Sequence, residues 1–460
     1  MMMVSLPRRL LWALTSGVIV VLAQLPSDPT DGLTVLTGTK TGVTEHATPT
    51  GPYLSVTSTL TLATTSLSSG GTLGSSIAPN ATDGFFSTLP TTTGTVTFLT
   101  GSASSKTTTG TDNATTTIDT TTAPIPTNTR PCNNYPEFCN RKYSNITEVG
   151  CHNSPFVRAG SAAANQQFPV TDQLNDGVRF LQAQMQWPAN ATAAGSPPHF
   201  CHTSCDLLDA GPITDWLTSV KDWVAAHPYD VVTILLGNGN YSTPDHYVPF
   251  IESTGILQYI YTPPIAPLAR DDWPTLAQMI LSGQRVIMFM DYMANQTAYP
   301  WLMDQFSQMW ETPFDPLDQK FPCTVQRPPD LSPEDAKKRL YLMNHNLNVE
   351  VALLGTTILV PAVSELNVTN NATGFGSVGL AANNCRSDWD YPPKILNVDY
   401  YNYGGYPGSV FEAAARVNNV SYGRPCCGAA ANAAGGRIDL VGVRVLVNMG
   451  LIWTAVWCLS

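Results

Sequence analysis

The stretch VVTILLGN, residues 231–238, is apolar at nearly every position before it ends in a glycine and an asparagine. A strand buried on both faces, as in a parallel sheet covered by helices, has this unbroken apolar pattern. The stretch before it, ITDWLTSVKDWVAAH (213–227), has its apolar residues three or four positions apart, which predicts an amphipathic helix. Together they predict a buried parallel strand and the helix that precedes it.

The same alternation extends in both directions along the chain. TLAQMILSG predicts another helix, with Gly283 as its C-cap. Further strand-length apolar stretches are residues 178–187, 285–292, 339–346 and 394–402. This rhythm predicts an α/β fold, a distorted (β/α)8 barrel of the TIM type. A doubly wound open sheet is the alternative, but the sequence lacks the glycine-rich phosphate loop that would favour it.

Composition divides the chain into four parts. Residues 1–23 carry two arginines before an apolar run and small residues near its end, which predicts a secretory signal peptide. Residues 24–130, rich in Ser and Thr, predict a disordered, O-glycosylated stalk. Residues 131–427 have the composition of a globular domain and are expected to form the barrel. Residues 428–460 combine small residues, a short polar spacer and an apolar tail, which predicts a GPI-attachment signal.

The charge and the glycosylation sequons agree with an extracellular chain. Its net charge is -11, only 12% of residues are charged, and no basic block is present, which argues against a nucleic acid partner. N-x-S/T sequons occur at Asn80, Asn113, Asn145, Asn190, Asn240, Asn295, Asn367, Asn371 and Asn419. We therefore expect a secreted glycoprotein held at the cell surface or cell wall, in contact with a membrane through its anchor.

The chain has 10 cysteines, which in a secreted protein predict disulfides. Two pairs are close enough in sequence to close small loops, and one further pairing is a hypothesis. These pairs are Cys132 with Cys139, Cys201 with Cys205, and, as the hypothesis, Cys323 with Cys385.

Polar residues follow several predicted strands, at the end where barrel enzymes carry their active sites. His152 and Asn153 follow the predicted first strand, NITEVG, and His202 follows the second. Gln182 and Gln184 are two residues apart on that second strand, so their side chains point the same way. Two histidines can act as general base and general acid in phosphodiester cleavage. Later strands end at Asp291, Asn344, His345 and Asp399.

The order and spacing of NITEVGCHNSPF, QLNDGVRFLQAQMQW and HFCHTSC resemble the X domain of the phosphatidylinositol-specific phospholipase C superfamily. The chain is more similar still to the secreted fungal PLC-like phosphodiesterases, and LYLMNHNL and ILNVDYYNYG fit that group. The resemblance covers about residues 132–427 and implies a distorted TIM barrel that cleaves phospholipids or other phosphodiesters. It implies that His152 is the base on the inositol 2-hydroxyl and that His202 protonates the leaving group. Asp399 could orient a histidine, bind a metal or cap its strand.

The sequence departs from this pattern at the two glutamines. The calcium-dependent branch has an asparagine beside the first histidine, matched by Asn153, but acidic residues where this chain has Gln182 and Gln184. The calcium-independent branch has an arginine at the second of these positions. Because amide oxygens carry no net charge, any Ca²⁺ site is expected to be weakened. Another group would have to supply the charge, and Arg158 and Arg179 are candidates.

Three hypotheses about function follow. The histidine pair favours a phosphoric diester hydrolase that acts on a phosphoinositide or a glycosyl-phosphoinositide. The glutamines favour a non-catalytic, GPI-anchored surface protein that uses the barrel as a binding scaffold. The third and weakest hypothesis is a zinc site in HFCHTSC, formed by His199, Cys201, His202 and Cys205.

Overall fold

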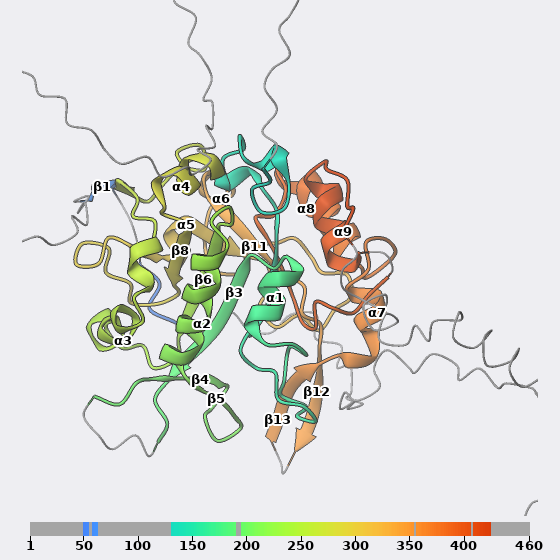
Figure 1. Cartoon of the computed structure of the whole chain (residues 1–460). Coiled ribbons are helices and arrows are strands. Elements are labelled where there is room, and N and C mark those ends of the chain that lie inside the picture. Colours follow the sequence, from blue (N-terminus) through green and yellow to red (C-terminus); the bar gives the residue numbers. More distant parts are fainter. Residues whose placement is uncertain are drawn as a thin grey trace, which may run out of the picture.

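The computed structural model describes residues 49–54, 58–62, 130–189, 195–353, 356–405 and 408–424 (Figure 1). Its centre is a curled parallel sheet with the strand order β10-β11-β14-β2-β3-β6-β8-β9, which is the chain order closed into a ring. The two ends of this order, β9 and β10, are joined by the short helix α5 (Gln305–Gln308). The fold is therefore the predicted distorted (β/α)8 barrel, which is open between β9 and β10 in the described part of the chain. The strands are β2 (Glu148–Cys151), β3 (Phe180–Gln186), β6 (Val232–Asn238), β8 (Val286–Met290), β9 (Leu302–Asp304), β10 (Met309–Glu311), β11 (Leu340–Asn344) and β14 (Ile395–Val398).

Helices cover the outside of the barrel. The predicted helix at 213–227 is α2 (Ile213–Ala226), and it buries Leu217, Val220 and Val224 against the sheet. The helix expected to end at Gly283 is α4 (Leu276–Ser282), and Gly283 has the left-handed φ of 75° that favours glycine. The other helices are α1 (Val170–Asp176), α3 (Val248–Ser253), α6 (Pro333–Lys338), α7 (Leu366–Thr369), α8 (Val378–Trp389) and α9 (Ser409–Val417). Short 3-10 helices are η1 (Pro136–Phe138), η2 (Tyr143–Asn145), η3 (Pro244–His246), η4 (Ile256–Tyr259) and η5 (Val363–Glu365).

Side chains alternate between the helix layer and the barrel interior, as the two-residue period of a strand requires. On β8, Val286 and Met288 join the cluster that includes most of the helices, whereas Ile287 and Phe289 join the interior cluster, to which α4 adds Leu276 and Met279. On β3, Phe180 belongs to the interior cluster. Positions 182, 184 and 186 have the same parity, so the three glutamines of β3 face the interior. Burial of each large apolar side chain contributes about 1.5–3 kcal/mol to the stability of this double layer.

The amino-terminal end of the barrel is closed by residues 130–146. Tyr143 and Trp273 are fully buried there, and the Tyr143 hydroxyl lies 2.8 Å from the Thr233 hydroxyl inside the barrel. Glu148 and Lys394 form a buried ion pair of 3.2 Å at the same end. Burial lowers the pKa of Lys394 to about 8 despite this partner. This end of the barrel is therefore largely filled with side chains.

Two hairpins project from the carboxyl end (Figure 1). Strands β4 (His199–His202) and β5 (Leu208–Pro212) extend the sheet in an antiparallel sense from β3. Strands β12 (Asn348–Leu353) and β13 (Thr356–Pro361) form a separate two-stranded sheet among the described residues. Neither hairpin follows from the barrel pattern, and both contribute to the cleft described below.

Two short pieces of the predicted stalk lie against the barrel. Strand β1 (Leu60–Thr61) pairs antiparallel with β7 (Ile265–Ala266) (Figure 1). In the piece formed by residues 49–54, the ring of Tyr53 packs on Tyr292, which follows β8. The signal-peptide and GPI-signal predictions, residues 1–23 and 428–460, lie outside the described residues. Within the described ranges, no helix is both long enough and apolar enough to cross a bilayer.

All three disulfide predictions are confirmed. Cys132–Cys139, Cys201–Cys205 and Cys323–Cys385 are bonded. In the described part of the chain, the buried Cys151 is the cysteine that remains free.

Candidate active site

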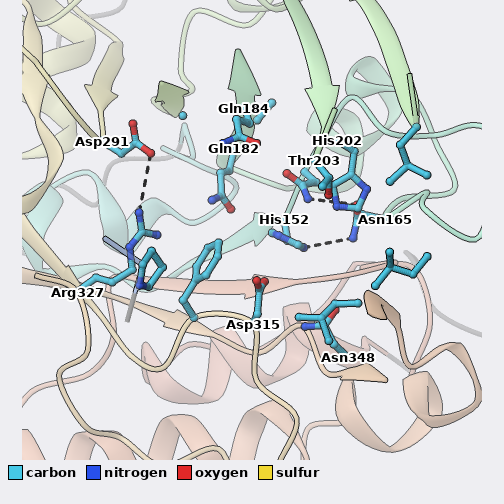
Figure 2. Close-up of a pocket in the computed structure, with 18 of the residues that line it drawn as sticks. His152, Asn165, Gln182, Gln184, His202, Thr203, Asp291, Asp315, Arg327 and Asn348 are labelled. Atoms are coloured by element: carbon cyan, nitrogen blue, oxygen red, sulfur yellow. Dashed lines mark hydrogen bonds and ion pairs between the residues drawn. The ribbon is translucent and has the colours of Figure 1, made fainter. Parts of the chain in front are cut away.

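A cleft of about 500 Å³ opens at the carboxyl ends of the barrel strands (Figure 2). The predicted site residues His152, Asn153, Gln182, Gln184 and His202 all line it. Figure 2 shows Asp291 and Arg327 at one end and His202 and Thr203 at the other, with Gln182 and His152 between them. The residues that the sequence predicted to form one site therefore line one cavity, although the strands that carry them are far apart in the chain.

His152 is oriented by Asp399. The imidazole Nδ1 of His152 lies 2.8 Å from Oδ1 of Asp399, and the amide nitrogen of Asn165 donates to the same carboxylate oxygen at 2.9 Å. The side-chain amide of Gln166 donates to the backbone carbonyls of His152 and Val398, which ties the two strand ends together. Of the three possibilities for Asp399, the geometry matches the one in which it orients a histidine. Nδ1 then carries the proton and Nε2 bears the lone pair in the neutral ring.

His202 is held by the backbone instead of a carboxylate. Its Nδ1 donates to the carbonyl oxygen of Ala163 at 2.7 Å, because a carbonyl can only accept. Its ring stacks on Phe156, with centroids 5.2 Å apart. Nε2 is again the nitrogen with the lone pair in the neutral ring. Both histidines thus have the same tautomer, fixed by two different partners.

The two histidines differ in their affinity for a proton. For His152, burial lowers the pKa, but the charge and hydrogen bond of Asp399 outweigh burial and leave the pKa above its ordinary value of 6.5. For His202, burial and the neighbouring charge of His152 lower the pKa to about 4. At neutral pH, His202 is therefore neutral and His152 is the ring that holds a proton more readily.

The glutamines are tied to neighbouring amides. The Gln182 carbonyl oxygen accepts from Nδ2 of Asn397 at 2.9 Å, and that of Gln184 accepts from Nε2 of Gln186 at 3.1 Å. Asn153 has a left-handed φ of 51° and donates to the Asn165 side chain. These neutral oxygens do not fit the acidic Ca²⁺ site of the calcium-dependent branch. Within the described ranges, no group of three or more His, Cys, Asp or Glu side chains could hold a metal ion.

The arginine in the cleft is Arg327, which sequence reasoning missed. It follows β10 and donates to Glu311 at 2.9 Å and to the Tyr292 hydroxyl at 2.8 Å. Its guanidinium lies over the rings of Phe306 and Phe314, 4.9 and 4.6 Å from their centroids, and is almost fully buried. No local motif marks this residue, because it belongs to an irregular segment and is brought to the cleft only by the fold.

Asp291, a strand end noted in the sequence, lies beside Arg327. Its Oδ2 is 3.9 Å from a guanidinium nitrogen, and its Oδ1 accepts from the backbone amides of Asn238 and Tyr292. Burial nevertheless raises the pKa of Asp291 to about 6. This end of the cleft is therefore polar and carries charges of both signs.

The prediction that Arg158 or Arg179 supplies positive charge to the site is wrong. Arg179 pairs with Asp230 at 2.7 Å, directly before β3 begins and so at the closed end of the barrel. Arg158 is exposed and donates to the backbone of Asp209. Neither lines the cleft.

His345 also lies outside the cleft. It is 1% exposed, its Nε2 donates to the carbonyl of Thr369, and its ring stacks on Phe321. Burial lowers its pKa to about 3. It is a neutral core residue.

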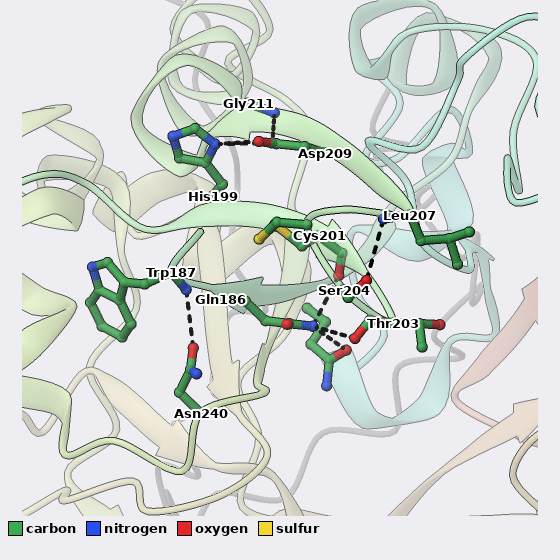
Figure 3. The surroundings of a disulfide bond; sticks show 12 residues. Gln186, Trp187, His199, Cys201, Thr203, Ser204, Leu207, Asp209, Gly211 and Asn240 are labelled. Carbon is green, nitrogen blue, oxygen red and sulfur yellow. Dashed lines mark hydrogen bonds and ion pairs between the residues drawn. A yellow bond between two sulfur atoms is a disulfide. The ribbon is translucent and has the colours of Figure 1, made fainter. Parts of the chain in front are cut away.

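The zinc hypothesis is wrong as well. Cys201 and Cys205 form a disulfide, so neither sulfur can be a thiolate ligand (Figure 3). His199 instead bonds to Asp209 at 2.8 Å. The disulfide secures the loop that follows His202.

The fold is an eight-stranded barrel with two histidines in a cleft at its strand ends. Comparison with known sequences identifies the family to which a protein of this class belongs. The family described as PI-PLC X 1 matches residues 138–418. The chain belongs to this PI-PLC X family.

Relatives support this assignment. A protein of Arthroderma benhamiae described as an uncharacterized secreted protein is 47% identical over 326 residues, which cover 69% of this chain and 72% of that protein. A PI-PLC X domain-containing protein 1 of the same organism is 38% identical and matched over 90% of its length. Human PI-PLC X domain-containing protein 1 is 27% identical over 30% of this chain and 39% of its own.

Two bacterial enzymes are among the solved structures to which this chain is similar. A phosphatidylinositol-specific phospholipase C from Staphylococcus aureus is 14% identical with a TM-score of 0.41, covering 61% of this chain and 94% of that one. A calcium-dependent phosphoinositol-specific phospholipase C from Pseudomonas sp. is 20% identical with a TM-score of 0.27, covering 36% of this chain and 63% of that one.

Proposed function

We propose that this chain is a phosphoric diester hydrolase of the phospholipase C type. The observation that carries the proposal is the pair His152 and His202, which line one cleft with the same tautomer fixed in each ring. In the proposed reaction, Nε2 of His152 takes the proton of the attacking hydroxyl and Nε2 of His202 protonates the leaving oxygen. Positioned acid–base groups of this kind each contribute about 10²–10⁴-fold.

The substrate's charge is part of this proposal. With a pKa of about 4, His202 is neutral at neutral pH, whereas its role requires a proton. The negative charge of a bound phosphodiester favours protonated His202 over the neutral ring and thereby raises its pKa. Arg327 contributes positive charge at the far end, but Glu311 and Asp291 offset much of it. Charge stabilisation is therefore weaker here than with an unpaired arginine, and slow turnover is expected.

The proposed substrates are phosphoinositides or glycosyl-phosphoinositides at a membrane surface. The polar end formed by Asp291, Tyr292 and Arg327 suits a polyhydroxylated head group. The family membership supports the phosphodiester class.

We further propose that the protein is secreted, with a signal peptide at 1–23, a stalk at 24–130, the catalytic domain at 131–427 and a GPI signal at 428–460. The sequons, the three disulfides and the secreted relative support an extracellular site of action. The GPI signal rests on sequence alone.

A second candidate function is a non-catalytic surface scaffold. Gln182 and Gln184 favour it, because both carbonyl oxygens are bonded to neighbouring amides and neither residue carries charge toward a phosphate.

The test is an assay of the purified secreted protein on phosphatidylinositol, a GPI and a glycerophosphodiester, each with and without Ca²⁺. We expect cleavage of an inositol-containing substrate that does not depend on Ca²⁺. Binding of these compounds without turnover of any of them would favour the scaffold.

A further inference from the structure

The segment Pro49–Leu54, which we call the strap, lies against the cleft although the barrel domain begins only near residue 130. The ring of Tyr53 packs on Tyr292 and Phe306, with centroids 5.4 and 4.8 Å apart. The Tyr241 hydroxyl donates to the backbone carbonyl of Thr50 at 3.2 Å. Pro49 itself lines the cleft. The strap is therefore part of the cleft wall and is supplied by a segment outside the family match.

The contact is close enough to constrain the sequence. A Cβ added to Gly51 would lie 2.1 Å from Cε1 of Tyr292, so only glycine fits against this ring. The Tyr53 hydroxyl donates to the carbonyl of Pro49 at 2.7 Å, which closes the strap on itself. A second attachment follows at Leu60–Thr61, which pairs with β7, and at the buried Leu62. Two independent attachments hold this part of the chain on the barrel.

The strap lies at the polar end of the cleft. The Tyr292 hydroxyl lies 3.4 Å from the Tyr53 hydroxyl and accepts from Arg327, so strap and arginine share one hydrogen-bonded chain. Figure 2 shows Arg327 and Asp291 at the end remote from His202.

Apolar lining lies on the side of His202. Leu207 belongs to the loop after that residue (Figure 3), and Ile358 and Leu359 of the hairpin β12–β13 also line the cleft. Leu207 is 38% exposed, which leaves it available to an apolar chain. A substrate with a polar head group and an apolar tail would therefore place its head group toward Arg327 and the strap.

We propose that the strap limits the size of the head group that the cleft accepts. In this proposal the cleft accepts a head group of one polyol ring, and the strap, whose Pro49 lines the cleft, blocks the path of a head group extended by a further sugar. This inference rests on the proposed function and selects phosphoinositides over glycosyl-phosphoinositides among its substrates.

The test releases the strap in the full secreted chain. The variant G51V/Y53A introduces the clash with Tyr292 and removes the ring that anchors the strap, and L54A is the matched control because Leu54 is 41% exposed. The substrates are phosphatidylinositol and glucosaminyl-phosphatidylinositol. We expect the ratio of kcat/KM for the extended over the compact substrate to rise about ten-fold or more in the release variant, since steric exclusion is lost, and to stay constant in the control.

An unchanged ratio overturns the inference. The ratio is unchanged when kcat/KM rises equally for both substrates, which would make the strap a general inhibitor. It is also unchanged when kcat/KM falls equally for both. In parallel, calorimetry measures the affinities for inositol 1-phosphate and glucosaminyl-inositol 1-phosphate. The ratio of these two affinities is compared between the wild type and the release variant. A shift in this ratio without turnover by the wild type supports the strap and rejects the phosphodiesterase. Turnover without a shift in the ratio supports the phosphodiesterase and rejects the role of the strap. If the release variant binds neither probe, the role of the strap is also rejected.

Discussion

The Nδ1 atom of His152 lies 2.8 Å from Oδ1 of Asp399, although 247 residues separate them in the chain. The barrel creates this contact, because β2 and β14 are neighbours and Cys151 is in register with Val398. The next residue on each strand has the parity of the barrel interior, so both side chains turn inward: His152 lines the cleft and Asp399 is buried behind it. The pair is the structural basis of the first prediction.

We predict that D399N moves the pH dependence controlled by His152 to lower pH. Asp399 holds the pKa of His152 above 6.5, so its removal lets burial lower that pKa. The measurement is the pH profile of kcat/KM, which reports groups of the free enzyme. Asparagine preserves the size of the side chain, and thermal unfolding checks that the fold is intact. A profile identical to that of the wild type would show that Asp399 does not control His152.

We predict that the His202 ring stays neutral from pH 5 to pH 8 in the free protein, since burial and His152 lower its pKa to about 4. Titration of the imidazole resonances by NMR measures this directly, with the H202A spectrum as the assignment control. Inositol 1-phosphate should raise the pKa of His202, because the anion favours the protonated ring. A midpoint near 6.5 without ligand would be inconsistent with the described burial.

We predict that R327M destabilises the protein by about 3–5 kcal/mol, because it leaves Glu311 buried without its cation. The double variant R327M/E311Q should recover much of this loss, since glutamine removes the buried charge and keeps an oxygen that can accept from Gln305. Denaturant unfolding of the two variants measures the difference. Equal stabilities for single and double variants would mean that the ion pair is not what holds Arg327 in place.

We predict that Q182E/Q184D creates a Ca²⁺ response that the wild type lacks. Two carboxylates would then face the cleft beside Asn153, and charged oxygens bind Ca²⁺ more tightly than amides. The readout is the melting temperature with Ca²⁺ and with Mg²⁺, and Q186E, on the same strand face, is the control. If Ca²⁺ leaves the melting temperature of the double variant unchanged, the glutamines are not at the positions that define calcium dependence.

Much of the barrel was predictable because its central strands are long and apolar. The predicted strand 231–238 and the observed Val232–Asn238 agree to one residue. The two-residue alternation of a strand also predicts which polar strand ends face the barrel interior. Asn344 is two residues after Leu342, which faces the interior, whereas His345 points the other way and is buried outside the barrel interior. That signal was present in the sequence, and it separates His345 from Asp399.

Other parts were beyond the sequence for physical reasons. Strands β9 and β10 have three residues each, which is too short for a periodic pattern. Arg327 and the strap reach the cleft through contacts between segments far apart in the chain. The strap also lies in a Ser/Thr-rich stretch whose composition indicates disorder. One tyrosine and one glycine within it are not a pattern from which its packing on the barrel could be predicted.

The central claim is that His152 and His202 cleave a phosphodiester. The most direct measurement is turnover of phosphatidylinositol by H152A and H202A, with H199A as the matched control, since His199 is on the same strand as His202 but pairs with Asp209. We expect each of the first two variants to lose about 10²–10⁴-fold in kcat with an unchanged melting temperature, and H199A to keep wild-type turnover. Full turnover by the H152A/H202A double variant would contradict it.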